Sequence, residues 1–262
     1  MTPQELFAQA DLAGLHSQVA TEIRTNPQLA EPRALFVQVL CLEGEWERAA
    51  AQADALLKLS PASALFCTTI TRLIEAEQAR EQVFAGTRAP EWSGAQPAYA
   101  ADVCAALRAY GSGDTAAATA ATLRVMDALE PAAATLDGAA PQPWLIDADA
   151  RLTGVVEYLK DGHYCLVAQS DIKSMELAAP SHPVELLWPH VRITLRNGEV
   201  LVGRTTGRYP LTGTAKEPKL LMMQESAWLE TADNLYQGSG QHCWATEEGV
   251  VPLLTVSRIT FA

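Results

Sequence analysis

The sequence predicts an α+β fold, with tetratricopeptide-like helical-hairpin repeats in its first half and a small, mostly antiparallel β domain in its second. Two observations predict it. Up to about residue 135 the apolar residues recur at helical spacing, whereas after Pro143 they alternate as they do in strands. The second half also contains Asp161-Gly162 and Asn197-Gly198, two dipeptides typical of hairpin turns. We expect the boundary within residues 137–143, which gives domains 1–138 and 139–262.

The first half is predicted to contain helix pairs that resemble tetratricopeptide repeats. In residues 32–61 two helix-length apolar patterns meet at Gly44 and end at Pro61. A shift of 34 residues relates this unit to a shorter copy at residues 2–27, and a third copy turns at Gly113. An ordinary helical bundle with short hairpins is the alternative for this half.

The second half is predicted to consist of short strands separated by turns, in a curled sheet or an open barrel. Two short segments are expected to be helical instead. The expected strands lie within residues 155–169, 190–206, 219–230, 241–254 and 255–262, and the expected helices within 170–177 and 183–189.

Composition excludes several classes of partner. The chain carries 31 Asp and Glu against 19 Lys and Arg, a net charge of −12, and has no basic cluster. Such a surface repels nucleic acid and anionic membranes, so we expect neither as a partner. The sequence shows no secretory signal and no apolar run long enough to cross a membrane. Five widely spaced cysteines without a C-x-x-C pattern indicate reduced thiols, and we therefore expect a cytoplasmic location.

The pair Asp147-x-Asp149 raises the question of a metal site. A calcium loop that began at Asp147 would need an oxygen ligand, a glycine and a glutamate at its fifth, sixth and twelfth positions. Those positions hold Arg151, Leu152 and Tyr158. We therefore expect no metal and no cofactor, and we expect the aspartates to cap a turn or to pair with Arg151. No catalytic motif of the common hydrolase or nucleotide-binding classes occurs, so no catalytic residue is predicted.

The helical half offers a candidate surface for a protein partner. Tetratricopeptide-like arrays present a concave face, built from the first helix of each pair, that suits an amphipathic helix. The residues expected on this face are Ala34, Gln38, Cys41, Val103, Leu107 and Tyr110. The last three recur at helical spacing and form an apolar strip. The alternative is that Val103, Leu107 and Tyr110 are buried in the core.

Five segments, taken in order, resemble the ImpE family, whose members are also called TagJ or SciE-type proteins. They are residues 35–56, 72–92, 144–177, 186–199 and 207–210. The family usually shows D-A-D-x-R-x-G-P, whereas here Thr153-Gly154-Val155 follows Leu152 and Val155 stands in place of the proline. A second departure follows the fourth segment's start: the family shows W-x-P-A, whereas this sequence reads Trp188-Pro189-His190.

The resemblance implies a non-enzymatic adaptor of the bacterial type VI secretion system. Such an adaptor binds the N-terminal amphipathic helix of the small contractile-sheath subunit and assists sheath handling with the AAA+ disassembly ATPase. It also implies that Trp144, Asp147, Asp149 and Arg151 are domain-junction residues. Two alternatives stay open. One is a scaffold that binds another component, such as the ATPase itself, and the other is a hydrolase whose cleft would gather Asp147 and Asp149 with His163 or His190.

Overall fold

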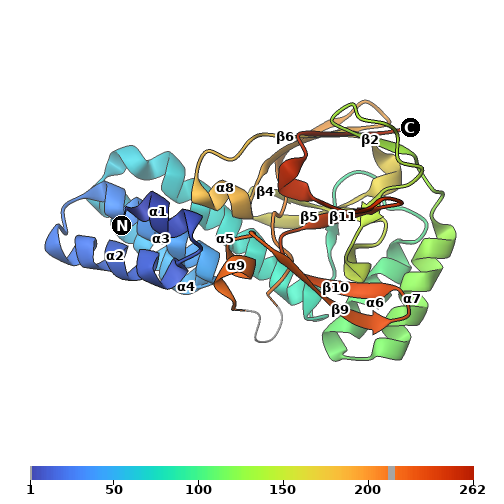
Figure 1. Cartoon of the computed structure of the whole chain (residues 1–262), viewed down its shortest axis with the longest axis horizontal. Helices are drawn as coiled ribbons and strands as arrows, with labels where there is room; N and C mark the ends of the chain where they lie inside the picture. Colours follow the sequence, from blue (N-terminus) through green and yellow to red (C-terminus); the bar gives the residue numbers. More distant parts are fainter. Residues whose placement is uncertain (1, 212–215) are drawn as a thin grey trace.

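The computed structural model describes residues 2–211 and 216–262. Helices come first along the chain and strands, mostly antiparallel, come later, which confirms the predicted α+β class. Figure 1 shows the N-terminal helices at one end of the molecule and the sheets at the other, with α5 running between them. In the described part of the chain, no helix is long and apolar enough to cross a membrane.

The helical half is built from pairs that turn at the expected glycines. Gly44 ends α3 with φ +75° and Gly113 ends α6 with φ +76°, the left-handed conformation that glycine adopts most readily. In the next helix after Gly44, Ala49 is fully buried, so the two helices of that pair approach closely. The helices are α1 (Pro3–Ala8), α2 (Leu12–Thr25), α3 (Ala30–Glu43), α4 (Trp46–Leu59), α5 (Ala64–Phe84), α6 (Ala100–Ser112) and α7 (Thr115–Ala128).

The main sheet has eight strands in the order β1-β5-β4-β8-β7-β6-β13-β2, and only β1 and β5 pair in parallel. Both predicted hairpins are present, because Asp161-Gly162 joins β4 to β5 and Asn197-Gly198 lies between β7 and β8. The strands are β1 (Glu91–Trp92), β2 (Ala134–Leu136), β4 (Val155–Lys160), β5 (His163–Ala168), β6 (Ile172–Leu177), β7 (His190–Leu195), β8 (Val200–Arg204) and β13 (Arg258–Phe261).

Two smaller sheets complete the strand-rich half. One is a hairpin of β9 (Ser226–Ala232) and β10 (Leu235–Gly240), and the other joins β3 (Ile146–Asp147), β11 (Cys243–Thr246) and β12 (Gly249–Pro252). Short helices α8 (Pro183–Leu187) and α9 (Pro218–Leu221) lie between strands. Figure 1 shows the β9–β10 hairpin beside α6 and α7, and β9 contacts α7.

Two of the sequence-based assignments are wrong. Residues 170–177 were expected to be helical, but Ile172–Leu177 form strand β6, which pairs with β7 on one side and with β13 on the other. The backbone bonds to two neighbouring strands outweigh the weak local preference. Conversely, the predicted strand over 219–230 begins with helix α9, because Pro218 stands at its first position, where proline favours a helix start.

Both edge strands of the main sheet come from the helical half. β1 follows α5 and pairs with β5, while β2 follows α7 and pairs with β13. The chain thus crosses the predicted boundary more than once. The division into residues 1–138 and 139–262 remains a prediction.

Alternate residues of β4 and β5 contribute to two apolar cores. Val155 and Leu159 pack with the helices in the first core, whereas Val156 and Tyr158 point to the opposite face and pack in the second. Because both faces of these strands are covered, residues 155–159 of β4 are all buried, and the only charged residue among them is Glu157.

Candidate functional site

A buried ion-pair network connects α5 to the sheet. The guanidinium of Arg80 donates to both carboxylate oxygens of Glu157, at 2.6 and 3.0 Å, and to Glu77 at 2.6 Å. It also donates to the backbone oxygen of Arg208 at 2.9 Å. Arg80 is 1% exposed and Glu157 is fully buried, so these charges are removed from water. These residues belong to a larger buried set that we call the junction network: Glu77, Arg80, Asp147, Asp149, Arg151, Glu157, Arg208 and His242.

The charges of the junction network stabilise one another. Burial alone would lower the pKa of Arg80, but the carboxylates of Glu157 and Glu77 outweigh burial and hold that pKa well above its ordinary value. Burial alone would raise the pKa of Glu157, yet Arg80 holds it below the usual range. Both groups are therefore charged near neutral pH.

The aspartate pair of the sequence lies in the same region. The carboxylate of Asp149 accepts the backbone N–H of Arg151 at 2.8 Å, pairs with its guanidinium, and accepts the backbone N–H of Gly238 at 2.8 Å. Asp149 thereby caps the short 3-10 helix η2 (Ala150–Leu152) and fastens it to β10. A turn-capping carboxylate paired with Arg151 is the arrangement expected from the sequence.

Asp147 makes a different set of contacts. One carboxylate oxygen accepts the backbone N–H of Asp149 at 2.8 Å and the hydroxyl of Tyr209 at 3.1 Å. The other is in hydrogen-bond contact with Nε2 of His242, a ring that stacks on Tyr209 at 4.8 Å. Burial raises the pKa of Asp147 despite the opposing effect of His242. The carboxylate of Asp147 in turn outweighs burial and raises the pKa of His242.

Arg208 links α3 of the helical half to α9 of the strand-rich half. Its guanidinium donates to the backbone oxygens of Leu42 at 2.6 Å and Leu221 at 2.7 Å. Burial lowers its pKa to about 10, with Glu77 opposing, so it stays charged at neutral pH. The junction network thus contains four acidic groups, three arginines and a histidine, all of them buried: Glu77, Asp147, Asp149, Glu157, Arg80, Arg151, Arg208 and His242.

This arrangement is suited to holding segments together rather than to acid–base chemistry. Its carboxylates and His242 each have a charged partner, and all of its groups are buried out of reach of a substrate. His163 and His190 are exposed and lie apart from Asp147, beside Glu91 and Glu185 respectively. Across residues 2–211 and 216–262, no group of three or more His, Cys, Asp and Glu side chains is placed to hold a metal ion.

Five members of the junction network were missed from the sequence: Glu77, Arg80, Glu157, Arg208 and His242. Apart from Glu77 and Arg80, which are neighbours on α5, they lie far apart along the chain, so no spacing pattern unites them. One signal was available. Glu157 interrupts the apolar run of β4, and a charged residue that is buried in a strand requires a partner.

The six residues expected on the partner face fall into two groups. Cys41, Val103 and Leu107 are at most 2% exposed and belong to the first core. For Val103 and Leu107 this is the buried alternative that the sequence left open, and the cause is that α6 packs against α5 and η2. Ala34, Gln38 and Tyr110 are half-buried.

Gln38 borders an apolar groove of about 430 Å³ between α1, α3 and the segment that leads into α8. Its side-chain oxygen accepts the backbone N–H of Val184 at 3.4 Å, which ties α3 to α8. Phe7, Leu35 and Leu186 are half-buried and line the groove with apolar surface. An apolar surface of this shape on helices is suited to the apolar face of another helix.

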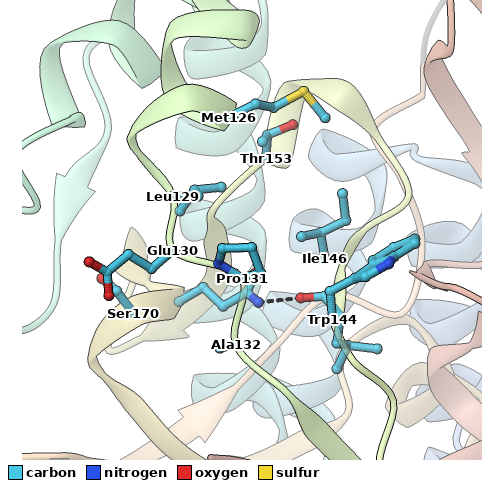
Figure 2. Close-up of a pocket in the computed structure, with 11 residues that line it drawn as sticks. Met126, Leu129, Glu130, Pro131, Ala132, Trp144, Ile146, Thr153 and Ser170 are labelled. Carbon is cyan, nitrogen blue, oxygen red and sulfur yellow. Dashed lines mark hydrogen bonds between the residues drawn. The ribbon is translucent and has the colours of Figure 1, made fainter.

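The last of the predicted junction residues, Trp144, is half-buried and lines a second cavity, shown in Figure 2. This cavity lies where the end of α7 meets the segment that precedes η2. The cavity and the groove beside Gln38 have no lining residue in common.

Comparison with known proteins identifies relatives of this chain. Residues 140–260 match the family model described as ImpE protein. The ImpE resemblance is confirmed. The chain is also 28% identical over 261 residues to the Pseudomonas aeruginosa protein named "Type VI secretion system accessory component TagJ", covering 100% of this chain and 91% of that protein.

A solved structure shares the fold of the whole chain. The crystal structure of protein VPA1032 from Vibrio parahaemolyticus matches with a TM-score of 0.90 at 21% sequence identity. The match covers 100% of this chain and 98% of the other. The two proteins therefore share the arrangement of helices and sheets despite their low sequence identity.

Proposed function

We propose that this ImpE-like chain is a non-enzymatic, cytoplasmic adaptor of the bacterial type VI secretion system. It binds the N-terminal amphipathic helix of the small contractile-sheath subunit and assists sheath handling together with the AAA+ disassembly ATPase. Support comes from the family match over residues 140–260 and from full-length similarity to a protein named as an accessory component of that system. The sheath helix itself is inferred from the family resemblance.

The groove beside Gln38 is the proposed site for this helix, and it is the observation that carries the proposal. Its walls come from α1, α2, α3, α8 and the loop before α8, and its half-buried apolar side chains leave carbon surface free to be covered. Burying such surface supplies the main driving force for binding an amphipathic helix. Of the six residues predicted on the partner face, Gln38 lines this groove, and Ala34 lies one turn before it on α3.

The junction network supports a non-catalytic role. Its acids and its histidine are the strongest concentration of titratable groups described above, yet each has a charged partner and less than 5% exposure. A general acid or base has to reach the proton that it transfers. A buried and fully paired set instead fixes the position of the sheet against α5.

A peptide that copies the first helix of the small sheath subunit tests the proposal. Calorimetric titration should show it binding to the wild-type chain, and Leu35→Asn should weaken binding about 5- to 150-fold, the range for truncating an anchor residue. Leu65→Asn is the matched control, because Leu65 is 81% exposed on α5 and lies outside the groove. Equal affinities for both variants would place the helix elsewhere, and no binding to the folded wild type would remove the proposal.

A second candidate function is a scaffold that binds another secretion component, such as the ATPase. The β9–β10 hairpin favours it, because Trp228 and Tyr236 are each 37% exposed and Leu229 is 65% exposed. Trp228 and Tyr236 share one face of the hairpin and Leu229 lies on the other. Exposed apolar side chains of this kind are typical of contact sites. Leu229→Ser should weaken capture of the purified ATPase under this scheme and leave binding of the sheath peptide unchanged.

A further inference from the structure

The cavity beside Trp144 has a volume of about 340 Å³, within the range of small-molecule sites. Figure 2 shows Leu129 and Pro131 on one side and Ile146 and Trp144 on the other. Most of its lining is carbon, and its exposed rim carries Glu130 and Ser170. The apolar walls favour a flat hydrocarbon group over a charged one.

One buried polar atom among the lining residues has no partner. Gln169 is 7% exposed, and its Nε2 donates to the backbone oxygen of Leu145, the bond drawn as a dashed line in Figure 2. That bond fixes the orientation of the amide, so the remaining atom is the acceptor Oε1. Oε1 is buried and accepts no hydrogen bond within the described residues. Leaving such an acceptor unsatisfied costs free energy that a donor in the cavity would recover.

No neighbour of Gln169 in the described part of the chain donates to Oε1 in this arrangement. The hydroxyl of Thr153 is committed to the backbone oxygen of Ala150 at 3.1 Å, and the hydroxyl of Tyr99 donates to the backbone oxygen of Gly154 at 2.9 Å. The indole N–H of Trp144 and the hydroxyl of Ser170 also line the cavity, but neither donates to Oε1. The acceptor is therefore left for a donor on a molecule bound in the cavity.

We propose that this cavity binds a flat, apolar group that carries a single N–H donor, of which indole is the simplest example. The ring packs between the Leu129–Pro131 side and the Ile146–Trp144 side, and its N–H donates to Oε1 of Gln169. The same chemistry is found in a free indole-like molecule and in a tryptophan side chain of a protein partner. The site uses none of the residues of the groove, so it stands independently of the sheath-helix proposal.

Calorimetric titration of the full-length chain with indole and with 1-methylindole tests the proposal. The two probes have nearly the same shape, but only indole has a donor. Indole should bind one to one and about tenfold more tightly than 1-methylindole, since one hydrogen bond to a buried acceptor distinguishes them. Gln169→Leu should remove this preference. Equal binding of the two probes to the wild type, or no binding of indole at millimolar concentration, would overturn the proposal.

A second variant tests the location without altering the amide. Ala132→Phe fills the cavity and should abolish binding of indole, while Ala101→Phe makes the same change on the exposed surface of α6 and should leave it intact. Undiminished binding to folded Ala132→Phe would place the ligand elsewhere and refute the assignment.

The source of the ring is decided by a third probe, N-acetyltryptophanamide. Affinity equal to or above that of indole would assign the site to a tryptophan of a protein partner. Affinity at least tenfold lower would assign it to a free small molecule. Either result retains the ligand chemistry proposed here.

Discussion

The guanidinium of Arg80 on α5 and the carboxylate of Glu157 on β4 form a two-point hydrogen-bonded pair, at 2.6 and 3.0 Å, that is almost completely shielded from water. A pair of this kind is strongly coupled, because removing one partner leaves the other charge buried and uncompensated. It connects the helical half to the sheet across 77 residues of sequence. Its contribution can be measured directly.

Arg80→Met should lower the free energy of unfolding by about 3–5 kcal/mol, since Glu157 is then left without its partner. The double variant Arg80→Met with Glu157→Met should recover part of that loss, because Glu157 no longer leaves a buried lone charge and only Glu77 then lacks its partner. Arg72→Met is the control on the same helix. Arg72 pairs with Glu75 at the surface, where such a pair contributes less than about 1 kcal/mol. Urea denaturation measures all three, and similar losses for Arg80 and Arg72 would contradict the assignment.

The Asp147–His242 pair predicts a dependence of stability on pH. The pKa of His242 is raised in the folded chain, mainly by Asp147 acting against burial, so the folded state holds this proton more tightly than the unfolded state. Its contribution to stability is complete below the unfolded value of about 6.5 and is lost as pH rises through the folded pKa. The free energy of unfolding should therefore fall with rising pH above about 6.5.

In His242→Gln this fall should be absent, while His163→Gln should behave as the wild type because His163 is exposed. Urea denaturation between pH 5.5 and 9, in steps of about half a unit, measures the difference. A fall of the same size in the wild type and in His242→Gln would show that another group titrates.

Leu107 was expected on a partner face, and the structure places it in the core at 2% exposure. Leu107→Ala should therefore lower the free energy of unfolding by about 2–5 kcal/mol. Tyr110, which is half-buried, should lose less when truncated to alanine. Titrating the sheath peptide into both folded variants completes the test. Weakened binding by Leu107→Ala without a loss of stability would restore the original expectation.

How much could be predicted from the sequence depended on how local the determining interactions are. Gly44, Gly113 and the Asp161-Gly162 turn each require a particular backbone conformation, so the sequence alone located them. Strand β6 was misassigned because its pairing with β7 and with the distant strand β13 is not encoded in its own local sequence. The same limit applies to the site.

The local contacts of Asp149 with Arg151 could be predicted, because the two residues are neighbours in sequence. The contact of Asp147 with His242 could not, because it joins positions 95 residues apart and depends on the pairing of β3 with β11. The groove beside Gln38 likewise needs α8, which reaches α3 only in the folded chain. Nothing in the spacing of residues along α3 indicates that contact.

The last prediction concerns the boundary at residues 137–143. This segment is exposed in part, and a protease that cuts there should separate the chain into two pieces that stay associated. The reason is that β2 pairs with β13, Asp137 accepts the backbone N–H of Ser257 at 3.0 Å, and Arg80 bonds to Glu157 across the cut. Size-exclusion chromatography of the nicked chain should show one peak that contains both fragments.

Fragment 1–138 alone should be mostly helical by circular dichroism, but less stable, because its half of the first core is exposed. Separate elution of the two fragments under native conditions would mean that the halves are held together mainly by the covalent chain.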